Sequence, residues 1–265
     1  MTIVVACGAF KGSLTAIEAC HHAAEGARRA HPDTDVVERP VADGGGGSLE
    51  VMVAGGARPV PVTASGPTGD PVETSFAAID PDTAFVEMAD ACGLLRLPGD
   101  TPRPLEASSR GVGEVLLAAL RSGRGNIHLG IGGSASTDGG TGMLSALGVR
   151  FLDADGAELP DGGGSLVQLD RVDLDGLDPA VRVARVLVAC DVDNPLLGPL
   201  GAAEMPTTRG RNHVEHASGT RPRRVNTNPN LAVSAAMRTS VGKVMVTPTP
   251  AAEPLIAEMT GLVMR

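Results

Sequence analysis

Up to about residue 190, the chain alternates between short β-branched runs, glycine-rich turns and stretches with helical spacing. Thr2–Cys7 is a continuous apolar run of the kind expected for a strand buried on both faces. Gly8 and Gly12 mark the turn that follows, and Thr15 with Glu18 forms a capping box at the start of a helix. This alternation predicts a parallel sheet with helical crossovers.

Residues 58–90 change character and predict an antiparallel or mixed sheet. Three short strands are expected there, joined by turns: Arg58–Thr63, Val72–Ile79 and Ala84–Met88. The other expected elements are strands Asp35–Arg39, Asn126–Ile131, Val149–Asp153 and Ala184–Cys190, and helices Ser48–Ala54, Ser109–Ser122 and Met143–Leu147. The acidic stretch Asp170–Asp178 is expected to be a solvated loop. Together these elements predict an α/β protein with two lobes and a cleft between them.

The composition changes sharply near residue 203. Residues 202–265 hold 8 Lys or Arg, 4 Glu and no Asp, and only 4 of the 35 glycines. Within them, Val241–Thr247 has the pattern of a strand and Ala251–Met264 that of a poor helix interrupted by Pro254. The predicted division is therefore 1–60 for the first lobe, 61–203 for the second, and 204–265 for an atypical tail. We interpret this tail as out-of-frame translation, a foreign fusion or a disordered segment.

Composition and charge argue against several classes of function. Four Phe are the only aromatic residues, which argues against stacking platforms for single-stranded nucleic acid, and a net charge of −9 disfavours binding to a phosphate backbone. No apolar run approaches the roughly 18–20 residues of a membrane span, and no basic segment precedes the apolar start. A cytoplasmic protein is therefore expected. The four cysteines form no Cys-x-x-Cys pair, so we expect small buried residues rather than a zinc site or a disulfide framework.

Four glycine-rich loops follow expected strands: Gly8–Leu14, Ala42–Ser48, Gly130–Gly142 and Asp191–Gly201. Ligands of open α/β sheets bind beyond the carboxyl ends of the strands, and glycines allow backbone N–H groups to approach an anion closely. The loop Gly130–Gly142 combines six glycines with four hydroxyls and a carboxylate, which predicts a phosphate cradle. The alternative is a flexible surface loop.

Charged residues in these loops are candidates for chemistry. Lys11 precedes Gly12, an order that does not match a Walker A loop, yet it could place a charge on a phosphate or carboxylate. Asp191 and Asp193 lie two residues apart, so on an extended segment they share one face and suit Mg²⁺. Either could instead accept a hydroxyl proton, or form an Asx turn before Pro195.

Five motifs, in order and in register, resemble the bacterial glycerate kinase family over residues 1 to about 203. They are Phe10–Leu14, Ala42–Gly45, Glu87–Ala89, Gly130–Ala135 with Asp138–Gly140, and Cys190–Leu196. The resemblance implies two α/β lobes, one Rossmann-like with a parallel sheet and the other with a mixed sheet. It also implies transfer of the γ-phosphoryl group of ATP to D-glycerate, in many members giving 2-phosphoglycerate. ATP and Mg²⁺ are then the expected cofactors and glycerate the partner, with no nucleic acid and no membrane.

The resemblance and the residue chemistry together assign expected roles. Lys11, Asp43 and Asp191 are expected to be catalytic, and Asp138 and Asp193 to bind metal. Contacts to substrate or phosphate are expected from Ser13, Gly44, Gly45, Gly132, Gly133, Ser134, Asp138, Gly139, Gly140 and Asn194.

Departures from the family pattern keep a second hypothesis open. Gly8 and Ala9 replace an acid and a hydroxyl of the first loop, Gly46 stands where the family has Glu, and no family motif follows Ala203. An inactive remnant, or a non-catalytic protein that binds nucleotide or an organic acid, is the alternative. A dinucleotide-dependent oxidoreductase is disfavoured, because no Gly-x-Gly-x-x-Gly follows the first strand. The hydroxyl that is phosphorylated and the oligomeric state stay open.

Overall fold

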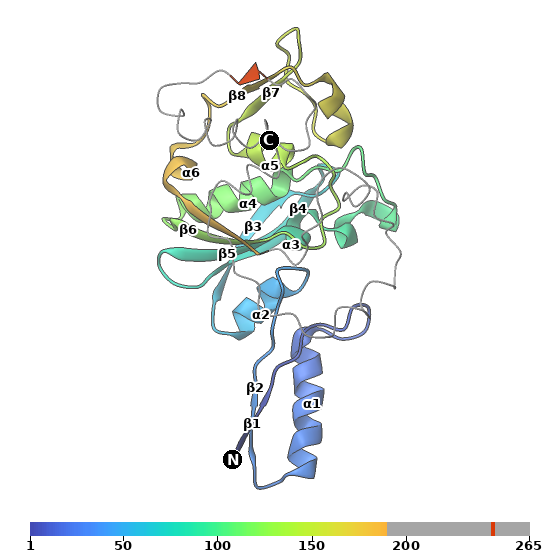
Figure 1. The fold of residues 1–265 in the computed structure, drawn as a ribbon, viewed down its shortest axis with the longest axis vertical. Coiled ribbons are helices and arrows are strands. Elements are labelled where there is room, and N and C mark those ends of the chain that lie inside the picture. The colour runs from blue at the N-terminus through green and yellow to red at the C-terminus, as the bar shows by residue number, and fades with distance from the viewer. Residues whose placement is uncertain (190–244, 247–265) are drawn as a thin grey trace.

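The computed structural model describes residues 1–189 and 245–246. Helices and strands build three sheets, of two, three and five strands, with helices packed against them (Figure 1). The two-stranded sheet is parallel and the five-stranded sheet is mixed. The predicted α/β class, with a parallel-sheet part and a mixed-sheet part, is therefore confirmed. The boundaries 1–60 and 61–203 remain predictions.

The N-terminal part is a parallel strand pair with one crossover helix. Strand β1 (Thr2–Val5) lies beside β2 (Asp35–Glu38), and α1 (Ala16–Ala30) connects them and packs on both. The capping box forms as expected, because Thr15 Oγ1 accepts a hydrogen bond from the Glu18 amide at 3.2 Å and Glu18 Oε2 accepts one from the Thr15 amide at 2.8 Å. Satisfying these two N–H groups fixes where α1 begins.

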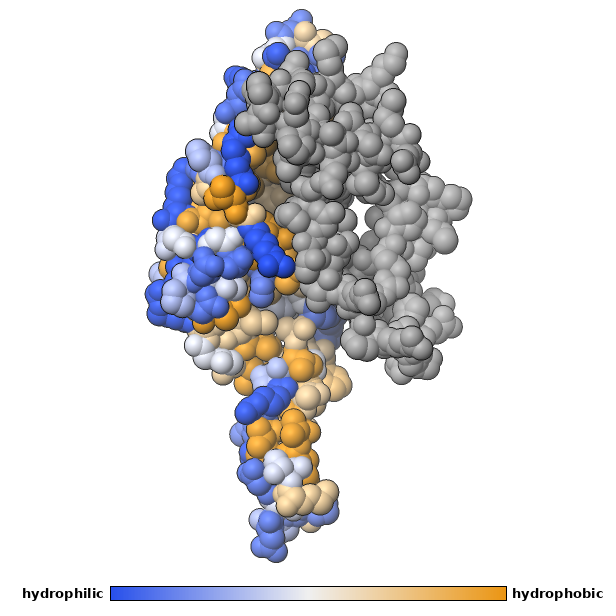
Figure 2. Space-filling view, turned by 60° about the vertical axis from the view of Figure 1, so that its left-hand side comes forward, coloured by the Kyte–Doolittle hydropathy of each residue, from blue (hydrophilic) through white to orange (hydrophobic). Residues whose placement is uncertain are grey.

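The prediction that the first strand is buried on both faces is wrong. Val4 is 62% exposed, and Phe10 and Val41 beyond the two strands are also exposed. Helix α1 packs on this strand pair, and side chains that α1 does not cover, such as that of Val4, are exposed. Figure 2 shows the resulting apolar surface on the narrow end of the molecule.

The five-stranded sheet forms the body of the protein. Its order is β3-β4-β5-β6-β9, with antiparallel pairing from β3 to β5 and parallel pairing from β5 to β9. The strands run over β3 (Arg58–Ser65), β4 (Pro71–Ala78), β5 (Thr83–Glu87), β6 (Asn126–Gly130) and β9 (Arg185–Ala189). Each lies within one or two residues of its expected range.

Helices lie on both sides of this sheet (Figure 1). The first side carries α3 (Met88–Cys92), α4 (Arg110–Arg121) and α5 (Thr141–Ala146). Their apolar residues pack with those of the sheet into the main core, which contains Phe76, Val112, Val115, Ile127 and Leu129, each at most 1% exposed. The other side carries α2 (Ser48–Ala54), which packs against β4 and β5.

The three-stranded sheet contains β8, a strand that the sequence did not lead us to predict. Strands β7 (Arg150–Leu152) and β8 (Arg171–Asp173) pair antiparallel, and β10 (Met245–Val246) runs parallel to β8. The expected solvated loop at 170–178 is therefore wrong in its first part, where Val172 is buried. Strand β10 lies within the predicted strand Val241–Thr247, whereas the predicted helix Ala251–Met264 lies outside the described residues.

Short elements complete the described chain. They are the 3₁₀ turns η1 (Leu94–Arg96), η2 (Pro98–Asp100) and η3 (Gly163–Gln168), and the helix α6 (Pro179–Val183). In the part of the chain that the structure describes, no helix has the length and apolar character to cross a membrane.

Candidate active site

Three parallel strands end side by side at one edge of the central sheet. Glu87 ends β5, Gly130 ends β6 and Ala189 ends β9, and Gly130 is paired in register with both of the others. The segments that follow therefore start from the same edge, which is where open α/β sheets bind ligands. This confirms that the 130–142 loop begins at a carboxyl edge of the sheet.

The 42–48 loop packs against the start of the 130–142 loop, backbone to backbone. The Gly132 amide donates to the Gly44 carbonyl at 3.1 Å. A Cβ added to Gly130 would lie 2.6 Å from the same carbonyl oxygen, and one added to Gly44 would lie 2.8 Å from the oxygen of Ala189. Gly44 also has φ of +90°, a conformation that side chains disfavour. Glycine at these positions therefore allows the loops to meet.

The buried side chain of Glu87, at the end of β5, holds the 42–48 loop in place by hydrogen bonds. Its side chain, 4% exposed, accepts hydrogen bonds from the Gly47 amide at 3.1 Å and the Leu49 amide at 2.6 Å, at the start of α2. Burial raises the pKa of Glu87, and the two amide donors oppose that rise. Although Glu87 lies in a motif that resembles the family, sequence reasoning assigned it no role, because nothing local indicates a partner 40 residues away.

Most of the glycine amides that were expected to hold phosphate already have protein acceptors. Gly44 donates to Ser48 Oγ at 3.2 Å and Gly45 to Asp43 Oδ1 at 2.9 Å. Gly132 donates to the Gly44 carbonyl, and Gly140 donates to Asp138 Oδ1 at 3.0 Å. These four glycines shape the loops, and their amides are not directed at a ligand in this arrangement.

Two exposed glycines, one from each loop, lie next to the same alanine. A Cβ on Gly46 would be 3.8 Å from the Ala89 Cβ, and one on Gly133 would be 3.3 Å from it. Within the described residues, neither glycine amide has an acceptor. Each loop therefore has, near Ala89, one N–H group without a protein acceptor among the described residues. Ser134, next to Gly133, has a hydroxyl 3.0 Å from that of Ser136.

Asp138 is buried and fully engaged by the protein. It is 1% exposed, and its Oδ2 accepts from the Ser109 amide and hydroxyl, each at 2.8 Å, and from the Gly142 amide at 3.2 Å. Its Oδ1 accepts from the Gly140 amide. These contacts join the starts of α4 and α5. The geometry therefore favours a positioning role, and the metal-binding role expected for Asp138 stays a prediction that this arrangement does not support.

Lys11 lies in an exposed turn at the carboxyl end of β1. The Phe10 amide donates to the Leu14 carbonyl at 2.9 Å, and the Ser13 hydroxyl donates to the Phe10 carbonyl at 3.3 Å. At the base of the turn, the Val41 amide donates to the Cys7 carbonyl at 3.0 Å. The Lys11 turn and the 42–48 loop therefore start next to each other, at the carboxyl ends of the paired strands β1 and β2.

Of the acidic residues expected to be catalytic or to bind metal, the structure describes Asp43 and Asp138 but not Asp191 and Asp193. Asp43 is exposed, and the Gly45 amide fixes its orientation through Oδ1. Asp191, Asp193 and Asn194 lie outside the described residues, directly after β9. Among the residues that are described, no three His, Cys, Asp or Glu side chains group closely enough to hold a metal ion. An exposed carboxylate such as that of Asp43 suits Mg²⁺, which takes few protein ligands together with phosphate oxygens.

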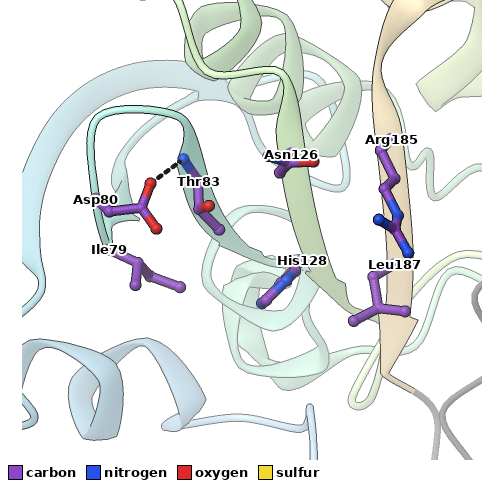
Figure 3. Close-up of a pocket in the computed structure, with 7 residues that line it drawn as sticks. All are labelled: Ile79, Asp80, Thr83, Asn126, His128, Arg185 and Leu187. Carbon is purple, nitrogen blue, oxygen red and sulfur yellow. Dashed lines mark hydrogen bonds between the residues drawn. The ribbon is translucent and has the colours of Figure 1, made fainter.

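A groove of about 410 Å³ lies elsewhere on the sheet, as Figure 3 shows. Thr83, Asn126 and Arg185 line it, and they are the first residues of β5, β6 and β9. The groove therefore lies toward the amino-terminal ends of the strands, away from the glycine-rich loops. We do not assign it to the candidate site.

Comparison with known proteins decides the family. A model of the glycerate kinase family matches residues 3–206. The chain belongs to the glycerate kinase family. Among its relatives, glycerate 2-kinase of Escherichia coli K12 is 47% identical over 209 residues, which are 77% of this chain and 54% of that protein. Glycerate kinase of Bacillus subtilis 168 is 46% identical over 204 residues, or 76% and 53% of the two chains.

The fold agrees with that of the glycerate kinase family. A crystal structure of a provisionally assigned glycerate kinase 2 from Salmonella typhimurium LT2 superposes with a TM-score of 0.68 at 43% identity. The superposition covers 77% of this chain and 55% of that one. The chain thus spans about half the length of the glycerate kinases that it matches.

Proposed function

We propose that this chain carries the phosphate- and substrate-binding loops of a kinase that transfers the γ-phosphoryl group of ATP to D-glycerate. The observation that carries the proposal is the contact between the 42–48 and 130–142 loops above Glu87 and Ala89. Two family motifs that are far apart in the sequence thereby form one surface at the carboxyl edge of the sheet. The similarity to proteins named glycerate kinase supports the substrate.

Phosphoryl transfer needs positioning, charge neutralisation and a group that orients the acceptor hydroxyl. We assign the phosphate contacts to the exposed amides of Gly46 and Gly133 and to the Ser134 hydroxyl. Lys11 supplies a positive charge from the neighbouring turn. Asp43, which is exposed and held by the Gly45 amide, accepts the proton of the glycerate hydroxyl or helps to hold metal.

The proposed cofactor is Mg²⁺ bound with ATP. When bound, Mg²⁺ supplies neutralisation of the phosphate charge, and Asp43, Asp191 and Asp193 are the residues that would hold it. We further propose 2-phosphoglycerate as the product, because the Escherichia coli relative is named a 2-kinase. A cytoplasmic location fits these small-molecule partners and is part of the proposal.

A second candidate is binding without turnover. It is favoured by Gly46, which occupies the position of the family's loop glutamate and supplies no carboxylate there. In this case the loops bind ATP or glycerate, and no ADP forms.

An ADP-release assay with ATP, Mg²⁺ and D-glycerate tests the proposal. The Lys11→Ala variant is expected to lower kcat/KM by about 100-fold, the loss typical of one preorganised group that stabilises transition-state charge. Lys243→Ala removes the other lysine of the chain and serves as the matched control, with activity unchanged.

The outcomes separate the two candidates. ADP formation that requires D-glycerate and is reduced only by Lys11→Ala supports the kinase. Saturable binding of ATP without ADP formation supports the second candidate. If the chain shows neither ATP binding nor ADP formation, both candidates are refuted.

A further inference from the structure

Cys7 and Cys20 lie against each other at the base of the Lys11 turn. Cys7 follows β1, and Cys20 lies in α1, which runs alongside β1 (Figure 1). The Cys7 amide donates to Cys20 Sγ at 3.2 Å, and Cys20 Sγ is 3.8 Å from the Cys7 carbonyl oxygen and 3.6 Å from that of Val5. The sulfur of Cys20 is therefore packed on the backbone of Cys7.

The environment of Cys7 raises the pKa of its thiol. Burial raises the pKa of Cys7, and the charge and the hydrogen-bonding thiol of Cys20 raise it further. A disulfide needs Cβ atoms about 3.5–4.5 Å apart, a distance that the backbone sets. The contact of Cys20 Sγ with the Cys7 amide, at 3.2 Å, places the two residues side by side, and rotation about the Cα–Cβ bonds would turn the two sulfurs toward each other. Both cysteines are free thiols, and the expectation of small buried residues holds for Cys20, whereas Cys7 is half-buried.

The difference in exposure determines which of the two cysteines is oxidised first. Cys7 is half-buried, whereas Cys20 is 1% exposed, so an oxidant in solution meets Cys7 first. Cys92 offers a contrast within the chain, because it is fully buried, its pKa is raised to about 11, and its Sγ donates to the Ser65 carbonyl at 3.6 Å. Its thiol is thus not accessible to an oxidant in solution, whereas that of the half-buried Cys7 is.

We propose that Cys7 and Cys20 are an oxidisable pair whose disulfide closes the segment that carries Lys11 and Ser13. With a peroxide as oxidant, the Cys7 thiolate attacks the O–O bond, which gives a sulfenic acid and releases hydroxide. The Cys20 thiol then attacks the sulfenic sulfur, the S–S bond forms, and water leaves. In total, two thiols and one hydrogen peroxide give one disulfide and two waters, with two electrons passing from sulfur to the peroxide.

The cross-link would restrain the Lys11 turn at both ends. Only 13 positions separate the two cysteines, and Gly8 and Gly12 have open space where a side chain would be, so the reduced turn has room to move. An effect on phosphoryl transfer rests on the proposed function, whereas formation of the disulfide does not. Disulfide formation is therefore measured on the cysteines themselves and not through enzymatic activity.

Trypsin offers a direct readout, because it cleaves after Lys11, between the two cysteines. The full chain with Cys190→Ser is treated with hydrogen peroxide, its free thiols are alkylated, and it is digested without reductant. The expected product is peptide 1–11 joined to peptide 12–28, about 2 Da lighter than the sum of the two and separated by dithiothreitol. Cys7→Ser in the same background is expected to remove it, and Cys92→Ala to leave it unchanged.

Other outcomes would overturn the proposal. These are recovery of Cys7 as a sulfinic acid beside an alkylated Cys20, or equal yields of all cysteine pairings. Oxidation in 8 M urea checks that the fold directs the pairing, and an undiminished preference for Cys7–Cys20 there would also contradict it. A rise in the melting temperature on oxidation, present in the parent and absent in Cys7→Ser, is the second expected sign.

Discussion

Asp138→Ala is expected to lower the free energy of unfolding by about 3–5 kcal/mol. The substitution leaves the buried amides of Ser109 and Gly142 and the half-buried amide of Gly140 without an acceptor, and each unsatisfied buried group costs about 1–3 kcal/mol. It also frees the Ser109 hydroxyl, which accepts from the Met143 amide at the start of α5. Urea unfolding followed by far-UV circular dichroism measures the loss.

Two variants control this experiment. Asp138→Asn keeps the shape and one acceptor oxygen, so we expect an intermediate loss. Asp155→Ala removes an exposed carboxylate and should change the unfolding free energy by less than about 0.5 kcal/mol. If Asp138→Ala unfolds like the wild type and loses only Mg²⁺-dependent nucleotide binding, Asp138 is a metal ligand and our positioning role is wrong.

Gly44→Ala is expected to cost about 3 kcal/mol or more and to abolish ATP binding. An alanine at φ of +90° is strained by about 1–2 kcal/mol. Its Cβ would also lie 2.8 Å from the Ala189 oxygen and 2.9 Å from the Ala189 Cβ, and overpacking of this kind adds about 1–3 kcal/mol. The 42–48 loop must then move away from β9 and from the 130–142 loop.

Gly26→Ala, in α1 and outside the proposed site, is the control. Its φ is not positive, and the added Cβ would meet no atom within 4 Å. Urea unfolding and isothermal titration with MgATP compare the two variants. Equal stability and equal affinity in both would show that the close contact between the loops has no role.

The sequence predicted the central sheet well because its signal is local. The strands around Phe76, Val86 and Ile127 carry β-branched and apolar residues between turn residues, and tertiary packing agrees with that pattern. It failed at Arg171–Asp173, where an alternation of charged and apolar residues was hidden among aspartates. The pattern has the period of two expected for a strand with one buried face.

The candidate site was predictable as a set of loops and not as a set of contacts. Glycines after strands indicated where the loops lie. Some amides are occupied by acceptors far along the chain, such as Glu87 for Gly47 and Gly44 for Gly132. Such pairings are set by tertiary packing, so single-sequence reasoning could not separate the loop-shaping Gly132 from the available Gly133.

The central claim is that the 42–48 and 130–142 loops form one surface for phosphate. Its most direct test is an NMR titration of the chain labelled with ¹⁵N-glycine, using MgATP and then D-glycerate. We predict that the amide signals of Gly46 and Gly133 shift together along one saturable curve, while Gly156, on an exposed turn, does not move. Shifts confined to a single loop, shifts at Gly125 beside the distant groove, or no shifts at all would contradict the claim.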